Sequence, residues 1–142
     1  MCSRSALVLF DPGSTHSYVS TYFAVSLGVL PDPLPIPLYV STLVGGSLVV
    51  DRVYRSCLVV LSRFETWAHL ILLEMVDFDV SLDMDWLYPY HAILVCHVKT
   101  ITLDMLGIPK VVWESTHGLC PRGLISSFQV RRLISQGCNS YL

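Results

Sequence analysis

ALVLFDPGSTHSY, residues 6–18, is the most informative stretch of this 142-residue chain. The apolar run at 6–10 predicts a strand buried in a core, because its length suits a strand and a turn signal follows it. Asp11 stands where the run ends, and Pro12 and Gly13 open the turn. The sequence thus predicts one carboxylate that is held by rigid packing on one side and faces open space on the other.

The turn after Asp11 carries residues suited to acid and base chemistry. Gly13 has no Cβ, so a second backbone or a ligand can approach closely there. The hydroxyls of Ser14 and Thr15 can donate hydrogen bonds to the Asp11 oxygens. We therefore expect the chemistry of this chain to centre on Asp11.

Residues Phe10–Tyr18 resemble the active-site loop of retropepsin-like aspartic proteases, in the form found in gypsy-class retrotransposon polyproteins of plants. The likeness covers roughly residues 5–114. It continues, in order, through Leu27–Gly28, Val44–Ser47, Val50–Tyr54, Met75–Val80, Met84–Leu87 and Pro89–Ala92. A lone Asp-x-Gly is a weak signal, but this ordered series of segments is specific to the family.

The resemblance implies an all-β fold, a small closed barrel of the retropepsin-like acid protease type with one or two short helices. Asp11 would be the catalytic residue, in an active-site loop formed by Pro12, Gly13, Ser14 and Thr15. Aspartic protease chemistry needs two carboxylates that share one proton, and one chain supplies one such residue. The resemblance therefore implies a homodimer that cuts a polypeptide substrate and needs no cofactor.

A hairpin is predicted by two β-prone runs, Ile36–Val44 and Ser47–Val53, which Gly45 and Gly46 separate. The resemblance implies that this hairpin is the flap, a mobile element that closes over bound peptide, with Gly45 and Gly46 near its tip. From the local sequence alone, an ordinary surface hairpin explains the pattern as well.

The rest of the domain is predicted to contain further short strands and two short helices. Strands are expected at Cys57–Leu61, Thr66–Leu73, Phe78–Leu82, Ile93–Val98, Thr100–Leu106 and Lys110–Trp113. Helices are expected at Ser17–Leu27, ended by Gly28, and at Met84–Tyr90. Strands this short and this closely spaced favour a small closed barrel, whose sheet the last three strands complete.

We assign residues 1–114 to an N-terminally truncated retropepsin-like domain and residues 115–142 to a linker and a connector helix towards a missing downstream domain. Leu124–Ser135 has a helical pattern with Arg131 and Arg132 on its polar side, which predicts a C-terminal helical tail. Few residues precede the first strand, where the family has another strand. One edge of the sheet is therefore expected to be open.

The composition is unusually apolar, with 53% hydrophobic and 14% charged residues and a mean hydropathy of +0.58. Either an obligate dimer interface or excision from a larger polyprotein accounts for this excess. The net charge is −2 and the basic residues are scattered, so we expect no nucleic-acid binding by this segment. The longest uncharged run, Pro33–Val50, contains prolines and a Gly-Gly pair that disfavour a membrane helix.

The cysteines and the N-terminus predict an intracellular protein, in the cytoplasm or in a virus-like particle. Five cysteines form an odd set without a C-x-x-C pair, which favours free thiols in a reducing compartment. Asp11 interrupts the early apolar run, so the layout of a signal peptide is not present.

Other groupings of acidic and metal-ligating residues are weaker candidates. An in-chain partner for Asp11 would have to come from Glu74, Asp77, Asp79, Asp83 or Asp85, but none of these begins an Asp-x-Gly turn. A calcium loop starting at Asp77 would need Gly and Glu where Leu82 and Tyr88 stand. A zinc site at His91, Cys96 and His97 is disfavoured because strand alternation points the last two apart. We therefore expect no metal.

Two departures from the family pattern concern the site itself. Pro12 stands where the family usually has Ser or Thr, whose hydroxyl and N–H help to lock two loops across the dimer axis. Asp83 stands where the second turn usually has Gly. Two hypotheses follow: an active homodimeric aspartic endopeptidase that cuts its own polyprotein at apolar junctions, or a decayed module that dimerises or binds peptide without cleaving.

Overall fold

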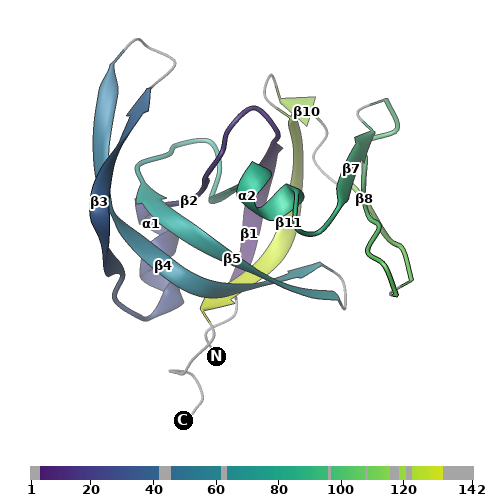
Figure 1. Cartoon of the computed structure of the whole chain (residues 1–142), viewed down its shortest axis with the longest axis horizontal. Coiled ribbons are helices and arrows are strands. Elements are labelled where there is room, and N and C mark those ends of the chain that lie inside the picture. The colour runs from purple at the N-terminus through teal and green to yellow at the C-terminus, as the bar shows by residue number, and fades with distance from the viewer. Residues whose placement is uncertain are drawn as a thin grey trace.

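The computed structural model describes residues 4–41, 46–61, 64–95, 97–107, 109–115, 119–120 and 123–132. Its strands form a large sheet and a small one, with only short helices, so the predicted all-β class is confirmed (Figure 1). The large sheet contains β1 (Arg4–Asp11), β2 (Ser17–Ser20), β3 (Asp32–Ser41), β4 (Ser47–Leu61), β5 (Phe64–Leu73), β6 (Val80–Asp83), β10 (Leu119–Cys120) and β11 (Gly123–Arg132). The small sheet contains β7 (Ala92–Val95), β8 (Thr100–Leu103) and β9 (Val111–Glu114). The helices are α1 (Thr21–Ala24), a 3-10 turn (Val25–Leu27) and α2 (Met84–Leu87).

The large sheet has the strand order β10-β11-β1-β6-β2-β5-β4-β3, and β11 also pairs with β4. Six strands, β11-β1-β6-β2-β5-β4, are therefore linked in a ring of pairings that returns to its start. Within this ring β1 lies between β11 and β6, and it pairs in parallel with β6. The strand that carries Asp11 is thus central and supported on both sides.

Apolar side chains fill the interior of this ring. Val8 and Phe10 on β1 and Leu82 on β6 are fully buried, as the apolar run at 6–10 predicts. Trp86 on α2 packs beside Phe10, with ring centroids 5.8 Å apart, and its Nε1 donates to the hydroxyl of Thr66 at 3.0 Å. The end of β1 and the start of α2 are therefore attached to one rigid core.

The helix predicted at Ser17–Leu27 begins later than expected. Residues Ser17–Ser20 form β2, because they pair with both β5 and β6. The Ser20 hydroxyl then accepts from the N–H of Phe23 at 3.0 Å and caps α1. The predicted cap at Gly28 is confirmed, since this residue is left-handed with φ 72°.

The predicted hairpin is confirmed as β3 and β4, which pair from Leu38↔Val50 to Ser41↔Ser47. β3 forms the outer edge of the large sheet, and its register shifts between Pro33 and Leu38. This irregularity suits the alternating prolines, because proline cannot donate to a strand ladder. Gly46 is described, whereas Gly45 lies outside the described residues.

The helical tail predicted at Leu124–Ser135 is wrong over residues 124–132, which belong to the strand β11. β11 runs antiparallel to β1 from Arg4↔Val130 to Phe10↔Leu124 and also pairs with β4 (Figure 1). The open sheet edge expected beside β1 is therefore covered, since unpaired backbone groups of β1 find their partners in this strand. The continuation of the tail towards a downstream domain stays a prediction.

The strands predicted after residue 92 exist but do not complete the first sheet. Among the described residues β7 pairs with β8 and β8 with β9, which makes a separate three-stranded sheet. Ile101 and Leu103 on β8 are buried in the main core. The small sheet therefore closes one side of the core and lies beside α2 in Figure 1.

Candidate functional site

Asp11 is the last residue of β1 and retains 7% of its surface exposed. Its Oδ1 accepts a hydrogen bond from the N–H of Gly13 at 2.9 Å. An ideal Cβ built on Gly13 would lie 3.2 Å from the same oxygen, which is tighter than ordinary packing. The predicted need for glycine here is thus explained by the close approach of the Asp11 carboxylate itself.

The hydroxyls that follow Asp11 do not act as predicted. The Thr15 hydroxyl forms its hydrogen bond with Nδ1 of His16, at 3.0 Å. The Ser14 hydroxyl instead acts on Asp83 and Tyr18, since it tends to lower the pKa of both side chains. The backbone of Ser14 ties the loop to α2, because its carbonyl accepts from the N–H of Met84 at 3.0 Å. The loop is therefore held by α2, while Asp11 is oriented by Gly13.

Asp83, the last residue of β6, lies directly beside Asp11. The two residues are register partners on the parallel pair β1 and β6. In a parallel pair, register partners project their side chains to the same face of the sheet. Both carboxylates line the same groove. The structure thus places Asp11 and Asp83 next to each other, whereas the sequence analysis disfavours Asp83 as a partner for Asp11 within the chain.

The Asp83 carboxyl is almost fully enclosed, with 1% of the residue exposed. The pKa of Asp83 is raised from 3.8 to about 7. Burial is the largest cause; the hydroxyls of Ser81 and Ser14 act to lower the pKa, and the charges of Asp11 and Asp85 act to raise it. The Ser81 hydroxyl donates to its Oδ1 at 2.5 Å. Asp83 is consequently neutral in mildly acidic solution and becomes charged as the pH passes neutrality.

The neighbouring Asp85 is held differently. Ser17 donates to it twice, from its hydroxyl and, at 3.2 Å, from its backbone N–H. The same Ser17 hydroxyl accepts from the N–H of Asp83 at 2.9 Å. Tyr18, also on β2, has its pKa raised by burial first and then by the charge of Asp83. Asp85 therefore has the donors that a carboxylate needs, and it fastens β2 to the end of β6.

A groove of about 710 Å³ opens above the two acids. Its walls come from the active-site loop, from both strands of the hairpin and from the segment before β6. Its lining includes Gly13–His16, Leu38–Ser41, Leu48 and Leu73–Phe78, together with Asp11 and Asp83. The hairpin predicted as a flap therefore borders the groove that contains Asp11. The position of the hairpin tip, at Gly45, is outside the described residues.

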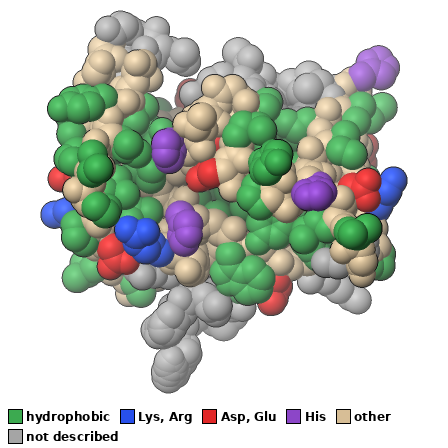
Figure 2. Space-filling view, in the orientation of Figure 1, with side chains coloured by type: hydrophobic (Ala, Val, Ile, Leu, Met, Phe, Trp, Pro, Cys, Tyr) green, Lys and Arg blue, Asp and Glu red, His purple; other side chains and the backbone are tan. Residues whose placement is uncertain are grey.

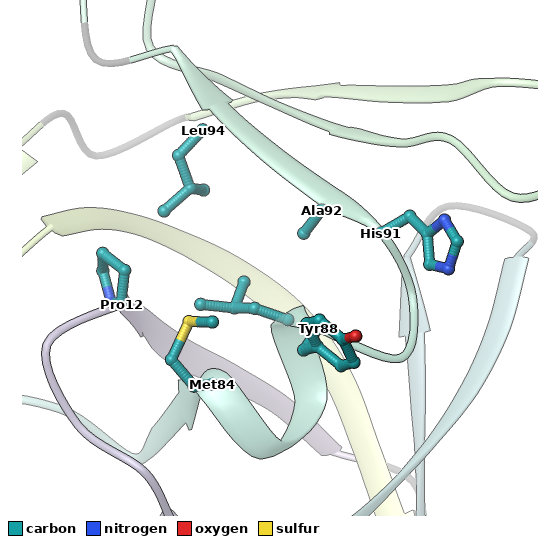
Figure 3. Close-up of a pocket in the computed structure, with 7 residues that line it drawn as sticks. Pro12, Met84, Tyr88, His91, Ala92 and Leu94 are labelled. Atoms are coloured by element: carbon teal, nitrogen blue, oxygen red, sulfur yellow. The ribbon is translucent and has the colours of Figure 1, made fainter.

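A second cavity, of about 520 Å³, lies on the other side of the active-site loop (Figure 3). It is lined by Pro12, Met84, Leu87, Tyr88, His91, Ala92 and Leu94. Figure 3 shows Met84 and Leu94 directed into it from α2 and β7, while the His91 ring points away. Pro12, which the sequence analysis singles out because it lacks an N–H and a hydroxyl, thus contributes an apolar wall to this cavity.

The surface and the metal candidates add little further chemistry. Figure 2 shows wide hydrophobic areas on the visible face, with Lys and Arg side chains in separate places. Within the described ranges, no three His, Cys, Asp or Glu side chains are grouped to hold a metal ion, and Cys96 lies outside those ranges. In the same ranges, no helix reaches the length and apolar character of a membrane span.

A comparison with known protein families matches residues 1–106 to the retroviral aspartyl protease family. The matched segment includes β1, the loop after Asp11, the hairpin, β6 and α2, and it ends before β9, β10 and β11. A comparison with curated proteins found no match.

Proposed function

Because the chain belongs to the retroviral aspartyl protease family, we propose that it is an aspartic endopeptidase that works as a homodimer with one Asp11 from each chain. The observation that carries this proposal is the place of Asp11. It ends a buried central strand and faces a groove of about 710 Å³ that the hairpin borders. A carboxylate placed in this way meets a bound peptide on its open side.

The proposed chemistry uses two Asp11 residues that meet across a two-fold axis. Two adjacent carboxylates share one proton, so that one activates a water molecule while the other donates to the carbonyl oxygen of the scissile bond. In each chain the N–H of Gly13 holds one Asp11 oxygen and thereby orients the carboxylate. Neither carboxylate could perform both roles alone, and in this proposal the second one comes from the partner chain.

The apolar cavity beside Pro12 supports a dimer contact at this loop. Met84 and Tyr88, which line it, are 37% and 76% exposed although they are hydrophobic. A second chain approaching the loop along the two-fold axis would cover this surface and remove it from water. The excess of apolar residues in the composition has the same explanation.

The groove fits a peptide with apolar side chains. Leu38, Val40, Leu48 and Leu73 supply apolar walls around Asp11. The proposed substrate is therefore a polyprotein of a gypsy-class retrotransposon, cut at apolar junctions inside the cell, in the cytoplasm or in a virus-like particle. The family match supports the peptidase class, and the apolar lining supports the choice of junction.

The direct test compares the wild-type chain with Asp11→Asn on a peptide that contains an apolar junction, between pH 4 and 6. Loss of the shared acid and base is expected to lower the cleavage rate by at least about 100-fold. A pepstatin-type inhibitor is expected to block the wild-type reaction. Asp51→Asn is the matched control, since it removes an exposed carboxylate on β4 and should leave cleavage unchanged. Cleavage that survives Asp11→Asn would rule the mechanism out.

Pro12 favours the alternative function, a module that dimerises or binds peptide without cleaving. Proline has no N–H and no hydroxyl, so it cannot tie one active-site loop to the other across the axis. If a folded dimer shows no cleavage, Pro12→Ser is expected to produce measurable cleavage, which Pro12→Ala would not. An inactive Pro12→Ser dimer would show that this residue is not the cause.

A further inference from the structure

The carboxyl of Asp83 is a buried titratable group for which the proposed chemistry has no role. It lies beside Asp11 in strand register, on the same face, in the same groove, and 1% of the residue is exposed. The Ser81 hydroxyl donates to Asp83, whereas Asp85 receives two hydrogen bonds from Ser17, one from its hydroxyl and one from its backbone N–H. The surroundings of Asp83 therefore suit a neutral carboxyl better than a charged one.

We propose that Asp83 is a positioning residue whose proton allows two Asp11 loops to meet, so that the dimer forms when Asp83 is neutral and separates when it is charged. This inference rests on the proposed homodimer. Each chain brings one Asp11 and one Asp83 to the same end of β1 and β6. Two chains that meet at this end bring four carboxyl groups together, and the repulsion among them grows with each proton that is lost.

Several titratable groups face this position from the neighbouring elements. They are Asp11 on β1, Tyr18 on β2 and Asp85 on α2, and the same groove is also lined by His16, Glu74 and Asp77. Asp85 is compensated by Ser17, and Tyr18 keeps its proton because its pKa is raised. Asp83 is a group beside Asp11 whose charge changes near neutral pH, since its pKa is raised to about 7, with burial as the largest cause.

The sign of the effect follows from proton linkage. If the partner's carboxylates raise the pKa of Asp83 further, association takes up protons, and the dissociation constant rises as the pH rises. Uptake of one proton makes the dissociation constant rise tenfold per pH unit. Uptake of two protons, one at each Asp83, makes it rise up to 100-fold per pH unit. Ionisation of Asp83 above neutral pH therefore opposes assembly of the site.

The test measures the dimer dissociation constant by sedimentation equilibrium at pH 5.5, 7 and 8.5. In the wild-type chain we expect it to rise at least tenfold more over this range than in Asp83→Asn, which keeps the shape without the charge. Asp51→Asn should follow the wild type, because Asp51 is exposed on β4. Asp83→Gly provides a second neutral variant if Asp83→Asn folds poorly, and circular dichroism verifies folding in each case.

A second measurement, the titration of the Asp83 carboxyl, can be made without dimer formation. A purely structural role of Asp83 would not require this titration to lie near neutral pH. Carbon NMR of the wild-type chain should show the Asp83 carboxyl titrating near neutral pH. In Asp11→Asn this midpoint should fall, because the neighbouring charge is removed. An Asp83 carboxyl that titrates near its usual value of 3.8 would overturn the proposal.

The outcomes separate this inference from the proposed function. A dimer that dissociates with the same pH dependence in Asp83→Asn as in the wild type overturns the role of Asp83 and leaves the peptidase standing. A dimer with the expected pH dependence but no cleavage supports Asp83 and overturns the peptidase. A chain that stays monomeric at every pH overturns both the homodimer and this role.

Discussion

A chain that ends at Ser115 is expected to lose its cooperative unfolding transition, although it contains the whole segment that matches the protease family. The truncation removes β10 and β11. β1 would lose its register partners from Arg4↔Val130 to Phe10↔Leu124, and β4 would lose those at 57–60. Ala6, Val8, Leu9 and Phe10 on β1 are almost fully buried, so their backbone groups would be left unpaired in or near the core.

The expected loss is comparable with the whole stability of a small domain. Each buried backbone group that loses its partner costs about 1–3 kcal/mol, whereas a domain is stable by about 5–15 kcal/mol in total. Breaking the β11 pairings on both sides also opens the ring of strands at two edges, which promotes aggregation. We therefore expect the truncated chain to be unfolded or insoluble under conditions in which the full chain is folded.

A chain that ends at Arg132 is the matched control, because it keeps β11 and removes only residues outside the described ranges. It should unfold in urea with the same midpoint as the full chain, followed by circular dichroism. Adding a peptide of residues 119–132 to the shorter chain should restore part of the transition. A chain of residues 1–115 that unfolds cooperatively at the full-length midpoint would show that β11 is dispensable.

The second large effect is a pH-dependent stability difference between the wild-type chain and Asp83→Asn. In the unfolded chain Asp83 loses its proton near its usual pKa of 3.8, whereas the folded chain keeps it up to about 7. Between these values the folded state binds more protons, so the free energy of unfolding falls as the pH rises. A difference of about three pKa units corresponds to a loss of at most about 4 kcal/mol above neutral pH.

Asp83→Asn has no such ionisation, and its amide oxygen can still accept from Ser81. The variant is therefore expected to be about as stable as the wild type near pH 4 and more stable by up to about 4 kcal/mol at pH 8. Urea unfolding at pH 4, 6 and 8, at one protein concentration, measures the difference. Asp51→Asn should show no such trend. A gain that is the same at every pH would mean that ionisation of Asp83 is not its source.

The local parts of the site could be predicted from the sequence, because local rules determine them. The apolar run and the turn after it placed Asp11 at the end of a buried strand, and the paired β-prone runs gave the hairpin. The Gly28 cap follows from the same kind of rule. Each of these features depends on residues that are close together in the chain, where propensity and periodicity carry the information.

The strand β11 was missed because its pattern fits two structures. LISSFQVRR can present an apolar side either as a helix or in alternation, whereas the sequence analysis considers only the helix. What selects the strand is the backbone of β1 and β4, which are more than 60 residues away in the chain and offer unpaired groups. The secondary structure of a segment near the end of a sequence can therefore be determined by unpaired strand edges that lie far away in the chain.

The neighbour of Asp11 was missed for a related reason. Asp83 has no Asp-x-Gly turn, and that local criterion excluded it. A non-local signal existed, since Val80–Asp83 repeats the design of β1, an apolar strand that ends in Asp. β1 and β6 pair in parallel, and parallel register places the two acids side by side. Pairing, and not the turn, brings them together.

The antiparallel pairing of β11 with β1 also bears on connectivity. Arg4 and Val130 are register partners, so the start of the first strand and the end of the last one are neighbours in space. A short loop joining them would form an ordinary hairpin, and a new break before β10 would leave every strand in place. Such a circularly permuted chain would have β11 ahead of the strand that carries Asp11. Permuted and unpermuted genes would thus encode the same set of contacts.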